Sequence, residues 1–401
     1  MQNALSMDSS RALRIQKTAD RLIDSAQFCG IAWQFAQHSN VLAEGESGFL
    51  DEPGGKSLPK DAIYRIYSMT KPMVSVLALQ LIEEGVLRLT DPVGLYLPEF
   101  SSLKVLQNDG SETQAMSPML VEHLLTHRSG LSYDFLPRCE VAKRYQSVNL
   151  IERGDRTLEE FIAVLATFPL AFEPGSQWRY SVATDVLARL LEVVTELSLP
   201  QLLEQRLFKP CGLVDTAFYV PMDKQHRLAS LYGSRQLGQV PALNDLPQKL
   251  TPLDVATSNP MDSPDTFVRG GHGLFSTTAD YQRFLPVLMT GLTPSGDRLL
   301  SSAMLDLMWA NRIPSSQMPL AIGDNPMPGY GWNLVGRVLL DMGASYSLTL
   351  PEEGGWGGAA STYFFVHRHT GLNGVVMTQY LGSAVPVGDD LRSAFLQALE
   401  F

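Results

Sequence analysis

The stretch "RIYSMTKPM", residues 65–73, decides how the chain is interpreted, because it places Ser68 three residues before Lys71 at the start of a long apolar run. Residues 72–84 carry apolar side chains at helical spacing, and Gly85 stands where a helix would end. On a helix, side chains three residues apart project from the same face. Ser68 and Lys71 are therefore either a nucleophile with its base or two polar residues that open a helix.

Helix placement separates this pair from two other Ser-x-x-Lys matches, at residues 57–60 and 101–104, which lie in loop-like sequence. A serine hydroxyl is a poor nucleophile until a neighbouring base takes its proton. The positive end of a helix dipole favours developing negative charge and disfavours a cationic lysine. Pro72 fits this placement, because with Ser68 near the N-cap its missing N–H falls in or next to the first turn. Spacing alone leaves open that Ser68 only caps the helix and that Lys71 is solvated.

Composition describes a globular chain with an acidic balance. The 401 residues are 45% apolar, enough for a substantial core, and their number suggests about two domains. The chain has 42 acidic and 31 basic side chains, and the basic ones do not cluster in a run. Both features argue against nucleic acid as a partner. No apolar segment has the length of a signal peptide or a membrane span, so we expect a cytoplasmic protein without a membrane partner. The widely spaced Cys29, Cys139 and Cys211 predict small buried side chains rather than disulfides or a zinc site.

The order of helical and strand patterns predicts one sheet built from both ends of the chain. A helical pattern at 9–26 precedes two strand patterns at 29–37 and 41–49, strand patterns return at 330–340, 361–368 and 373–380, and a helical pattern closes the chain at 389–400. Between them the sequence has short helical patterns and long loops. We therefore expect an α/β unit from residues 1–85 and 272–401, with residues 86–271 inserted as a mostly helical region.

The second candidate for chemistry is Tyr180 in "WRYSVATD", just before a helix expected to start at Val182 or Ala183. A tyrosine there could share a proton with Lys71 and Ser68. Because free lysine and tyrosine titrate near pH 10, neutrality of either at pH 7 needs a shift of about three pKa units, which only a desolvating pocket supplies. Taken alone, a tyrosine in such a position is more often a half-buried packing residue.

The third candidate is the glycine-rich stretch "EEGGWGGAAST", which leads into a late strand. Glycines let backbone approach a ligand, and an amide at the strand entrance could donate to an oxyanion. The alternative is a flexible turn around an exposed Trp356. No G-x-S-x-G or phosphate-binding loop is present, His127 has no accompanying aspartate pattern, and His367 with His369 lacks a third metal ligand.

Together, the spaced motifs resemble the serine β-lactamase and penicillin-binding-protein superfamily, and within it most closely the family VIII carboxylesterases and the related simvastatin-type acyltransferases. The resemblance covers nearly the whole chain. It rests on Ser68-Met69-Thr70-Lys71, on Tyr180 about 110 residues later, and on the stretches "GVLRLTDPVGLYLPEF", "VEHLLTHRSGL", "FEPGSQWRYS", "GGHGLFSTTADYQRF" and "WGGAAST".

The resemblance implies an α/β fold in which helices flank an antiparallel sheet, with the site in a crevice beside the helical region. It implies acyl transfer without a cofactor or metal: Ser68 attacks a carbonyl, and Lys71 with Tyr180 takes its proton and returns one to the leaving alcohol. The amides of Ser68 and Ala359 would hold the oxyanion. Tyr133 in "GLSYDF" would face the substrate pocket.

Two departures from the superfamily pattern bear on the substrate. Val182 replaces the asparagine of a Tyr-x-Asn motif, and Trp356-Gly357-Gly358 replaces Lys-Thr-Gly or His-Thr-Gly. Both changes remove polar groups that would engage a substrate amide or carboxylate, so a neutral ester is expected to suit the pocket better. The literal "HTG" at residues 369–371 follows a strand and is expected to form a turn.

The sequence thus predicts a serine carboxylesterase whose partner is a small ester with a short or medium acyl chain. An acyltransferase with the same acyl-enzyme is the first alternative. A β-lactamase, D-aminopeptidase or D-Ala-D-Ala carboxypeptidase is the second, and a non-catalytic penicillin-binding-like sensor is the third. The sequence does not indicate an oligomeric state.

Overall fold

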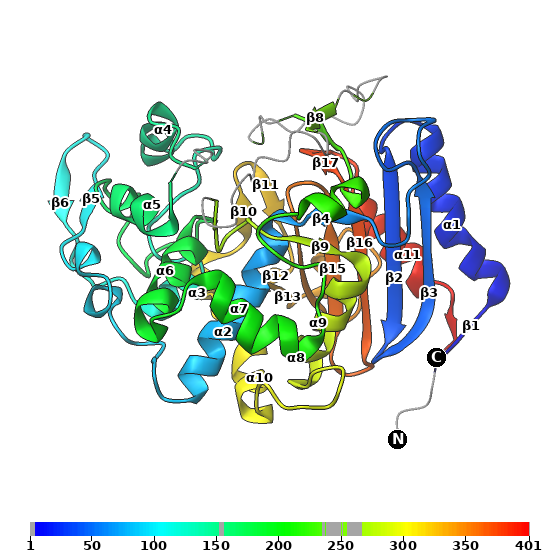
Figure 1. The fold of residues 1–401 in the computed structure, drawn as a ribbon. Coiled ribbons are helices and arrows are strands. Elements are labelled where there is room, and N and C mark those ends of the chain that lie inside the picture. Colours follow the sequence, from blue (N-terminus) through cyan, green and yellow to red (C-terminus); the bar gives the residue numbers. More distant parts are fainter. Residues whose placement is uncertain are drawn as a thin grey trace.

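The computed structural model describes residues 5–151, 156–234, 237, 250, 252–254 and 267–400, and centres on an antiparallel sheet (Figure 1). The sheet has the strand order β12-β13-β14-β15-β16-β2-β3, and every neighbouring pair is antiparallel. Its strands are β2 Gly30–Gln37, β3 Asn40–Gly48, β12 Tyr330–Trp332, β13 Arg337–Leu339, β14 Gly354–Gly357, β15 Tyr363–His367 and β16 Leu372–Thr378. The expected sheet built from both ends of the chain, flanked by helices, is confirmed.

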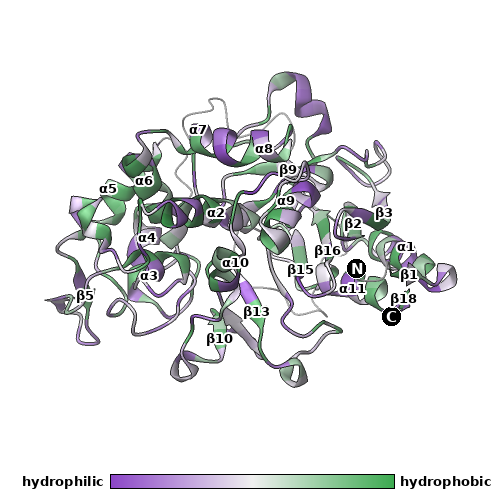
Figure 2. Cartoon of the chain, turned by 90° about the horizontal axis from the view of Figure 1, so that it is seen from below, coloured by the Kyte–Doolittle hydropathy of each residue, from purple (hydrophilic) through white to green (hydrophobic). Residues whose placement is uncertain are grey.

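Helices cover both faces of this sheet. The covering helices are α1 Ser9–Asp24 and α11 Val387–Leu396 on one side and α9 Thr278–Thr290 on the other. Strand alternation explains the two layers: the Phe365 ring lies 6.4 Å from that of Phe395 in α11, whereas the next ring along β15, Phe364, lies 5.3 Å from Tyr281 in α9. Figure 2 shows the hydrophobic colour running along the central strands.

A region of short helices lies at the other end of the molecule, on the far side of α2 from β2 and β3 (Figure 1). Its helices are α3 Val121–Leu125, α4 Glu140–Ser147, α5 Leu158–Leu165 and α6 Ala183–Thr195, and the chain then runs through α7 Leu199–Leu203 and α8 Lys209–Cys211 past α2 toward α9 (Figure 1). Smaller elements are α10 Ser302–Trp309, β1 Ser6–Met7, β4 Ile63–Arg65, β5 Lys104–Leu106, β6 Glu112–Gln114, β7 Leu231–Gly233, β8 Pro252–Asp254, β9 Phe275–Thr277, β10 Leu320–Ile322, β11 Asn325–Met327, β17 Tyr380–Leu381 and β18 Leu399–Glu400.

Helix α2, Thr70–Glu83, lies between the two regions and is buried on all sides from Thr70 to Leu81. A helix that is apolar all round is one that the core encloses. The expected N-cap role of Ser68 is wrong. Ser68 lies in a single 3₁₀ turn, Tyr67–Met69, and Met69 precedes α2 without any side-chain cap, because the Ser68 hydroxyl contacts Lys71 instead.

Two further expectations are corrected. The strand expected at residues 330–340 is a hairpin of β12 and β13, because Asn333 turns the chain by accepting hydrogen bonds from the amides of Val335 and Gly336. The glycine-rich stretch is not a flexible turn around an exposed tryptophan. Its residues Gly354–Gly357 form strand β14 inside the sheet, and Trp356 is buried.

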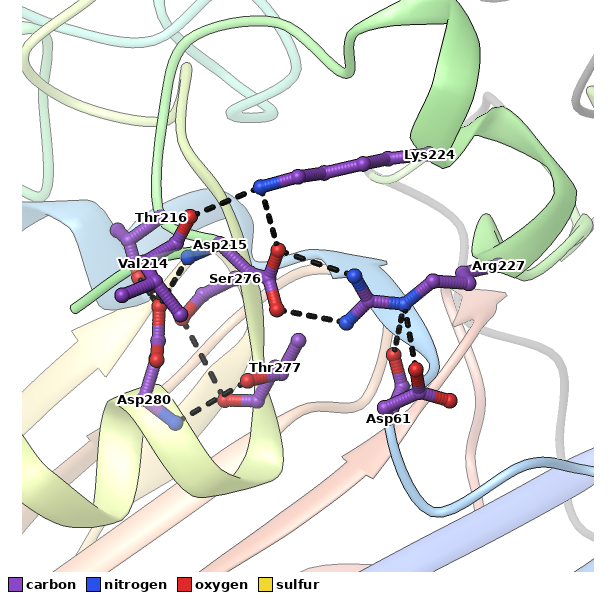
Figure 3. A network of polar contacts seen from close by, with 9 residues as sticks. All are labelled: Asp61, Val214, Asp215, Thr216, Lys224, Arg227, Ser276, Thr277 and Asp280. Atoms are coloured by element: carbon purple, nitrogen blue, oxygen red, sulfur yellow. Dashed lines mark hydrogen bonds and ion pairs between the residues drawn. The ribbon is translucent and has the colours of Figure 1, made fainter.

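A polar network fastens the segment after α8 to strand β9 and helix α9 (Figure 3). Arg227 donates two hydrogen bonds to Asp215, at 3.0 and 2.6 Å, and Lys224 lies 2.8 Å from the same carboxylate. The buried Asp280 accepts from the Asp215 amide at 2.7 Å and from the Thr216 hydroxyl at 2.9 Å. The network thereby holds β9, which pairs with β4 directly before the Ser68 turn.

The structure also bears on the cysteines, on membrane-spanning helices and on the division of the chain. All three cysteines are buried and free, as expected. Searched over the described residues, the chain contains no helix with the length and apolar character needed to cross a membrane. The division at residues 85 and 271 stays a prediction, and part of the inserted region falls outside the described residues.

Candidate active site

Ser68 and Lys71 meet where strand β4 ends and α2 begins. The Lys71 Nζ atom lies 3.1 Å from the Ser68 Oγ atom, within hydrogen-bond distance. The same Nζ lies 2.9 Å from the Tyr133 hydroxyl and donates to the Gly271 carbonyl at 2.7 Å. Three segments far apart in the sequence therefore meet at one amine.

Burial changes the acid–base behaviour of Lys71. Only 2% of its surface is exposed, and desolvation lowers the pKa of its amine to about 7, against a smaller opposing effect of the Asp185 carboxylate. A lysine with that pKa is neutral in a large fraction of molecules near pH 7 and can accept a proton. Lys71 is thus a base poised beside a hydroxyl.

Tyr180 reaches the same hydroxyl from the loop before α6. Its side chain is hydrogen-bonded to Ser68, and its hydroxyl accepts from the Trp356 Nε1 atom at 3.1 Å. Burial raises the pKa of the Tyr180 phenol, so the phenol stays protonated near pH 7. Lys71 lies 4.7 Å from the centre of the Tyr180 ring, and it is Tyr133, not Tyr180, whose hydroxyl contacts the lysine amine.

The turn after β14 faces Ser68 from the sheet. The Gly358 amide donates to the Thr362 carbonyl at 2.8 Å, which fixes the turn, whereas the Ala359 amide donates to no residue that the structure describes. A free amide in a cavity wall is what an oxyanion needs. The Ala359 amide is therefore available as a donor in the cavity wall, and its oxyanion role, which the family resemblance implies, stays a prediction.

A cavity of about 760 Å³ brings most of the expected site residues together. Its walls include Ser68, Tyr133, Tyr180, Trp356, Gly357, Gly358 and Ala359. Lys71 lies directly behind Ser68. Val182, expected at the pocket, does not line it: the side chain is fully buried at the start of α6.

Asp185, Gly271 and His272 lie at the same site but were not identified from the sequence. Asp185 is fully buried and accepts from the Gly271 amide at 3.0 Å, so it holds the segment whose carbonyl binds Lys71. His272 lines the cavity, and burial lowers its pKa to about 3. The stretches "WRYSVATD" and "GGHGLF" carried all three, but nothing in either stretch indicates that they meet. In the part of the chain that the structure describes, no group of His, Cys, Asp or Glu side chains is arranged to hold a metal.

Comparison with known proteins agrees with this geometry. The model of the family described as Beta-lactamase matches residues 15–399, almost the entire chain. The chain belongs to the Beta-lactamase family. This confirms the resemblance found in the sequence and assigns the chain to a family of serine hydrolases.

Proteins similar to this chain include some that are named as esterases or hydrolases. It is 29% identical to esterase EstB of Burkholderia gladioli over 98% of this chain and 97% of that one. It is 32% identical to protein Rv1367c of Mycobacterium tuberculosis over 87% and 85% of the two chains. The solved structure of "EstCE1, a hydrolase with promiscuous acyltransferase activity" matches with a TM-score of 0.80 and 26% identity, over 96% of this chain and 98% of that one.

Proposed function

We propose that the chain is a serine carboxylesterase that hydrolyses esters of short or medium acyl chain through a covalent acyl-serine. The observation that carries the proposal is the 3.1 Å contact between Ser68 Oγ and the Nζ of a lysine whose pKa burial lowers to about 7. The esterases among its relatives support the same reaction class.

Acylation begins when neutral Lys71 accepts the Ser68 proton and Oγ forms a bond to the ester carbonyl carbon. The negative charge that develops on the carbonyl oxygen is bound by the amides of Ser68 and Ala359. As the intermediate collapses, the bond to the alcohol oxygen breaks and that oxygen takes a proton from the Lys71–Tyr180 pair. The acyl group is then on Ser68, and the alcohol leaves.

Deacylation repeats these steps with water as nucleophile. Lys71 and Tyr180 take a proton from water, the hydroxide adds to the acyl carbonyl, and the Ser68 oxygen leaves and regains its proton. Tyr133 orients Lys71 by accepting from Nζ at 2.9 Å, and the rings of Tyr180 and Trp356 form an apolar wall for the alcohol.

Acyl transfer to an alcohol is the second candidate function. EstCE1, whose described activity combines hydrolysis with acyl transfer, is similar over nearly the whole chain. The partly open cavity gives an alcohol the same path to the acyl-serine as water. Adding an alcohol and measuring transesterification product tests this function.

The test of the main proposal compares wild type with Ser68→Ala on p-nitrophenyl butyrate and on a chromogenic cephalosporin. We expect ester cleavage that the variant loses, and little cephalosporin turnover. Full esterase activity in Ser68→Ala would show that the nucleophile is wrong. Rapid cephalosporin turnover with negligible ester cleavage would overturn the esterase assignment. A cytoplasmic location and the oligomeric state stay untested.

A further inference from the structure

The cavity that contains Ser68 continues past the Trp356 turn to a charged wall. There it is lined by Arg337 of β13, Tyr363 of β15, and Gly388 with Asp389 in the first turn of α11. The proposed mechanism uses none of these residues. A charged wall in an otherwise largely apolar cavity therefore needs its own explanation.

Strand β14, next to Arg337 in the sheet, carries two glycines on the face to which the Arg337 side chain projects. Arg337 pairs with Gly355, and Tyr363 pairs with Gly357, so all four residues present the same face. The Arg337 guanidinium carbon lies 5.7 Å from the centre of the Tyr363 ring. Of the two glycines, Gly357 lines the cavity together with Arg337 and Tyr363, so a ligand in the cavity can reach the backbone of β14 there.

Two aromatic rings hold the Arg337 side chain. Its guanidinium lies 4.6 Å from the centre of the Tyr330 ring and against Tyr363, and among the residues that the structure describes it forms neither a hydrogen bond nor an ion pair. The rings fix the plane of the guanidinium and leave its N–H donors unused. A half-buried arginine in that state is suited to a planar anion.

The carboxylates near Arg337, Glu353 and Asp389, are ion-paired with a second arginine. Arg392, fully buried, forms ion pairs with Glu353 and, at 3.0 Å, with Asp389. The two arginines and two carboxylates sum to zero charge, so the wall has no net positive field. An anion would be held by direct, charge-assisted hydrogen bonds from Arg337.

Strand alternation also indicates which end of an ester reaches Arg337. Trp356 lies between the two glycines, so its side chain projects to the opposite face, where Nε1 contacts the Tyr180 hydroxyl. The proposed mechanism protonates the leaving alcohol there. The acyl group is therefore the part that extends toward Arg337.

We propose that Arg337 forms an anion subsite for a carboxylate at the far end of the acyl group. Preferred substrates are then monoesters of dicarboxylic acids. This rests on the proposed function of Ser68 and replaces the expected neutral acyl group by an anionic one. The cation lies on β13 and not at the position that Trp356 occupies, so the sequence pattern did not reveal it.

The kinetic test compares p-nitrophenyl monoadipate with p-nitrophenyl hexanoate, two esters with acyl chains of six carbons. We expect wild type to prefer the adipate and Arg337→Gln to lower the adipate-to-hexanoate ratio of kcat/KM by at least about tenfold, mainly through KM. Arg337→Lys should keep part of the preference, because it keeps the charge but not the planar fork. The exposed Arg298→Gln is the control and should leave the ratio unchanged. An unchanged ratio in Arg337→Gln, or equal loss on both esters, overturns the subsite.

A binding measurement separates this proposal from the proposed function. In Ser68→Ala, calorimetry should detect monomethyl adipate, and adding Arg337→Gln should weaken that binding by at least about tenfold. If wild type cleaves no ester but this difference appears, the esterase proposal fails and the subsite stands. If esters are cleaved and the difference is absent, the subsite fails alone.

Discussion

Lys71 shows how a single residue is tuned by its surroundings. The amine is almost fully buried, and the polar atoms around it, the hydroxyls of Ser68 and Tyr133 and the Gly271 carbonyl, are uncharged. Uncharged dipoles stabilise the charged ammonium less than water does, whereas the neutral amine loses little on burial. The pKa of Lys71 is therefore lowered. The base is therefore created by the fold, not by the residue type.

The pH dependence of kcat/KM should report this pKa. Below about pH 7 Lys71 is protonated and cannot take the Ser68 proton, so activity should fall about tenfold per pH unit. Above pH 7 it should level off, because the Tyr180 phenol, whose pKa burial raises, remains protonated. A pH–rate profile with p-nitrophenyl butyrate measures this, and an acid limb near pH 10 would contradict it.

Asp185 gives a second prediction at this scale. Its carboxylate raises the pKa of Lys71, so Asp185→Asn should move the acid limb to lower pH. The amide oxygen of the variant can still accept from Gly271, which keeps the segment in place. Burial lowers the pKa of the neighbouring His127 and His272, so both stay neutral near pH 7 and neither replaces the lost charge. The exposed Asp109→Asn serves as control, and a limb that stays or moves up contradicts the prediction.

At the scale of elements, the site depends on the contact between the turn after β14 and the turn before α2. A Cβ atom at Gly358 would overlap the carbonyl oxygen of Ile66, two residues before Ser68, and the Thr362 hydroxyl. Because one of these atoms is backbone, the clash cannot be relieved by a side-chain rotation. Overpacking of this kind costs about 1–3 kcal/mol.

We therefore expect Gly358→Ala to lower the melting temperature and to lower kcat/KM by at least about tenfold. Gly343→Ala is the matched control, since its nearest atom is a side-chain oxygen 3.2 Å away on an exposed turn. Thermal melts and steady-state kinetics on both variants test the contact. Wild-type kinetics in Gly358→Ala would show that the two turns are not coupled.

The polar network of Figure 3 makes a prediction about stability. Burial alone would raise the pKa of Asp215, but hydrogen bonds from Arg227 and Lys224 lower it overall. Asp215→Asn should lower the free energy of unfolding by about 1.5–3 kcal/mol at pH 7. Because the folded pKa is depressed, the difference from wild type is present above about pH 4 and disappears as pH falls further.

Urea unfolding at pH 7 and pH 3 measures this difference. The control is Asp306→Asn, which removes a highly exposed partner of Arg368 and should change stability by about 1 kcal/mol or less. Equal effects of the two substitutions at pH 7, or a difference as large at pH 3 as at pH 7, would contradict the assigned role of Asp215.

Elements with strong local patterns were predictable from the sequence. The opening hairpin lies close to its expected bounds, and the helix after Tyr180 begins at one of the two residues expected. The hairpin of β12 and β13 was not predicted, because the turn is set by hydrogen bonds to the Asn333 side chain, and the apolar residues around Asn333 and Gly336 read as one continuous strand. The burial of α2 on all sides was also not predicted, because the spacing of its apolar residues indicates a helix but not how many elements pack around it.

At the scale of the whole molecule, the cavity is assembled from segments that are distant in sequence. Ser68, Tyr133, Tyr180 and Ala359 come from four separate parts of the chain and line one cavity. Family resemblance pointed to all four residues from the sequence. The contact of Lys71 with Tyr133, the support from Asp185 and the open donors of Arg337 depend on tertiary packing, which no local pattern encodes.

The most direct measurement is the mass of the protein trapped during turnover of p-nitrophenyl butyrate. Rapid acid quenching followed by intact and peptide mass spectrometry should find one butyryl group, located on the peptide that contains Ser68. Ser68→Ala should show none, and Lys71→Met should form the adduct at least about a hundredfold more slowly. A butyryl group on any other residue, or hydrolysis at the wild-type rate in Ser68→Ala, would contradict the account.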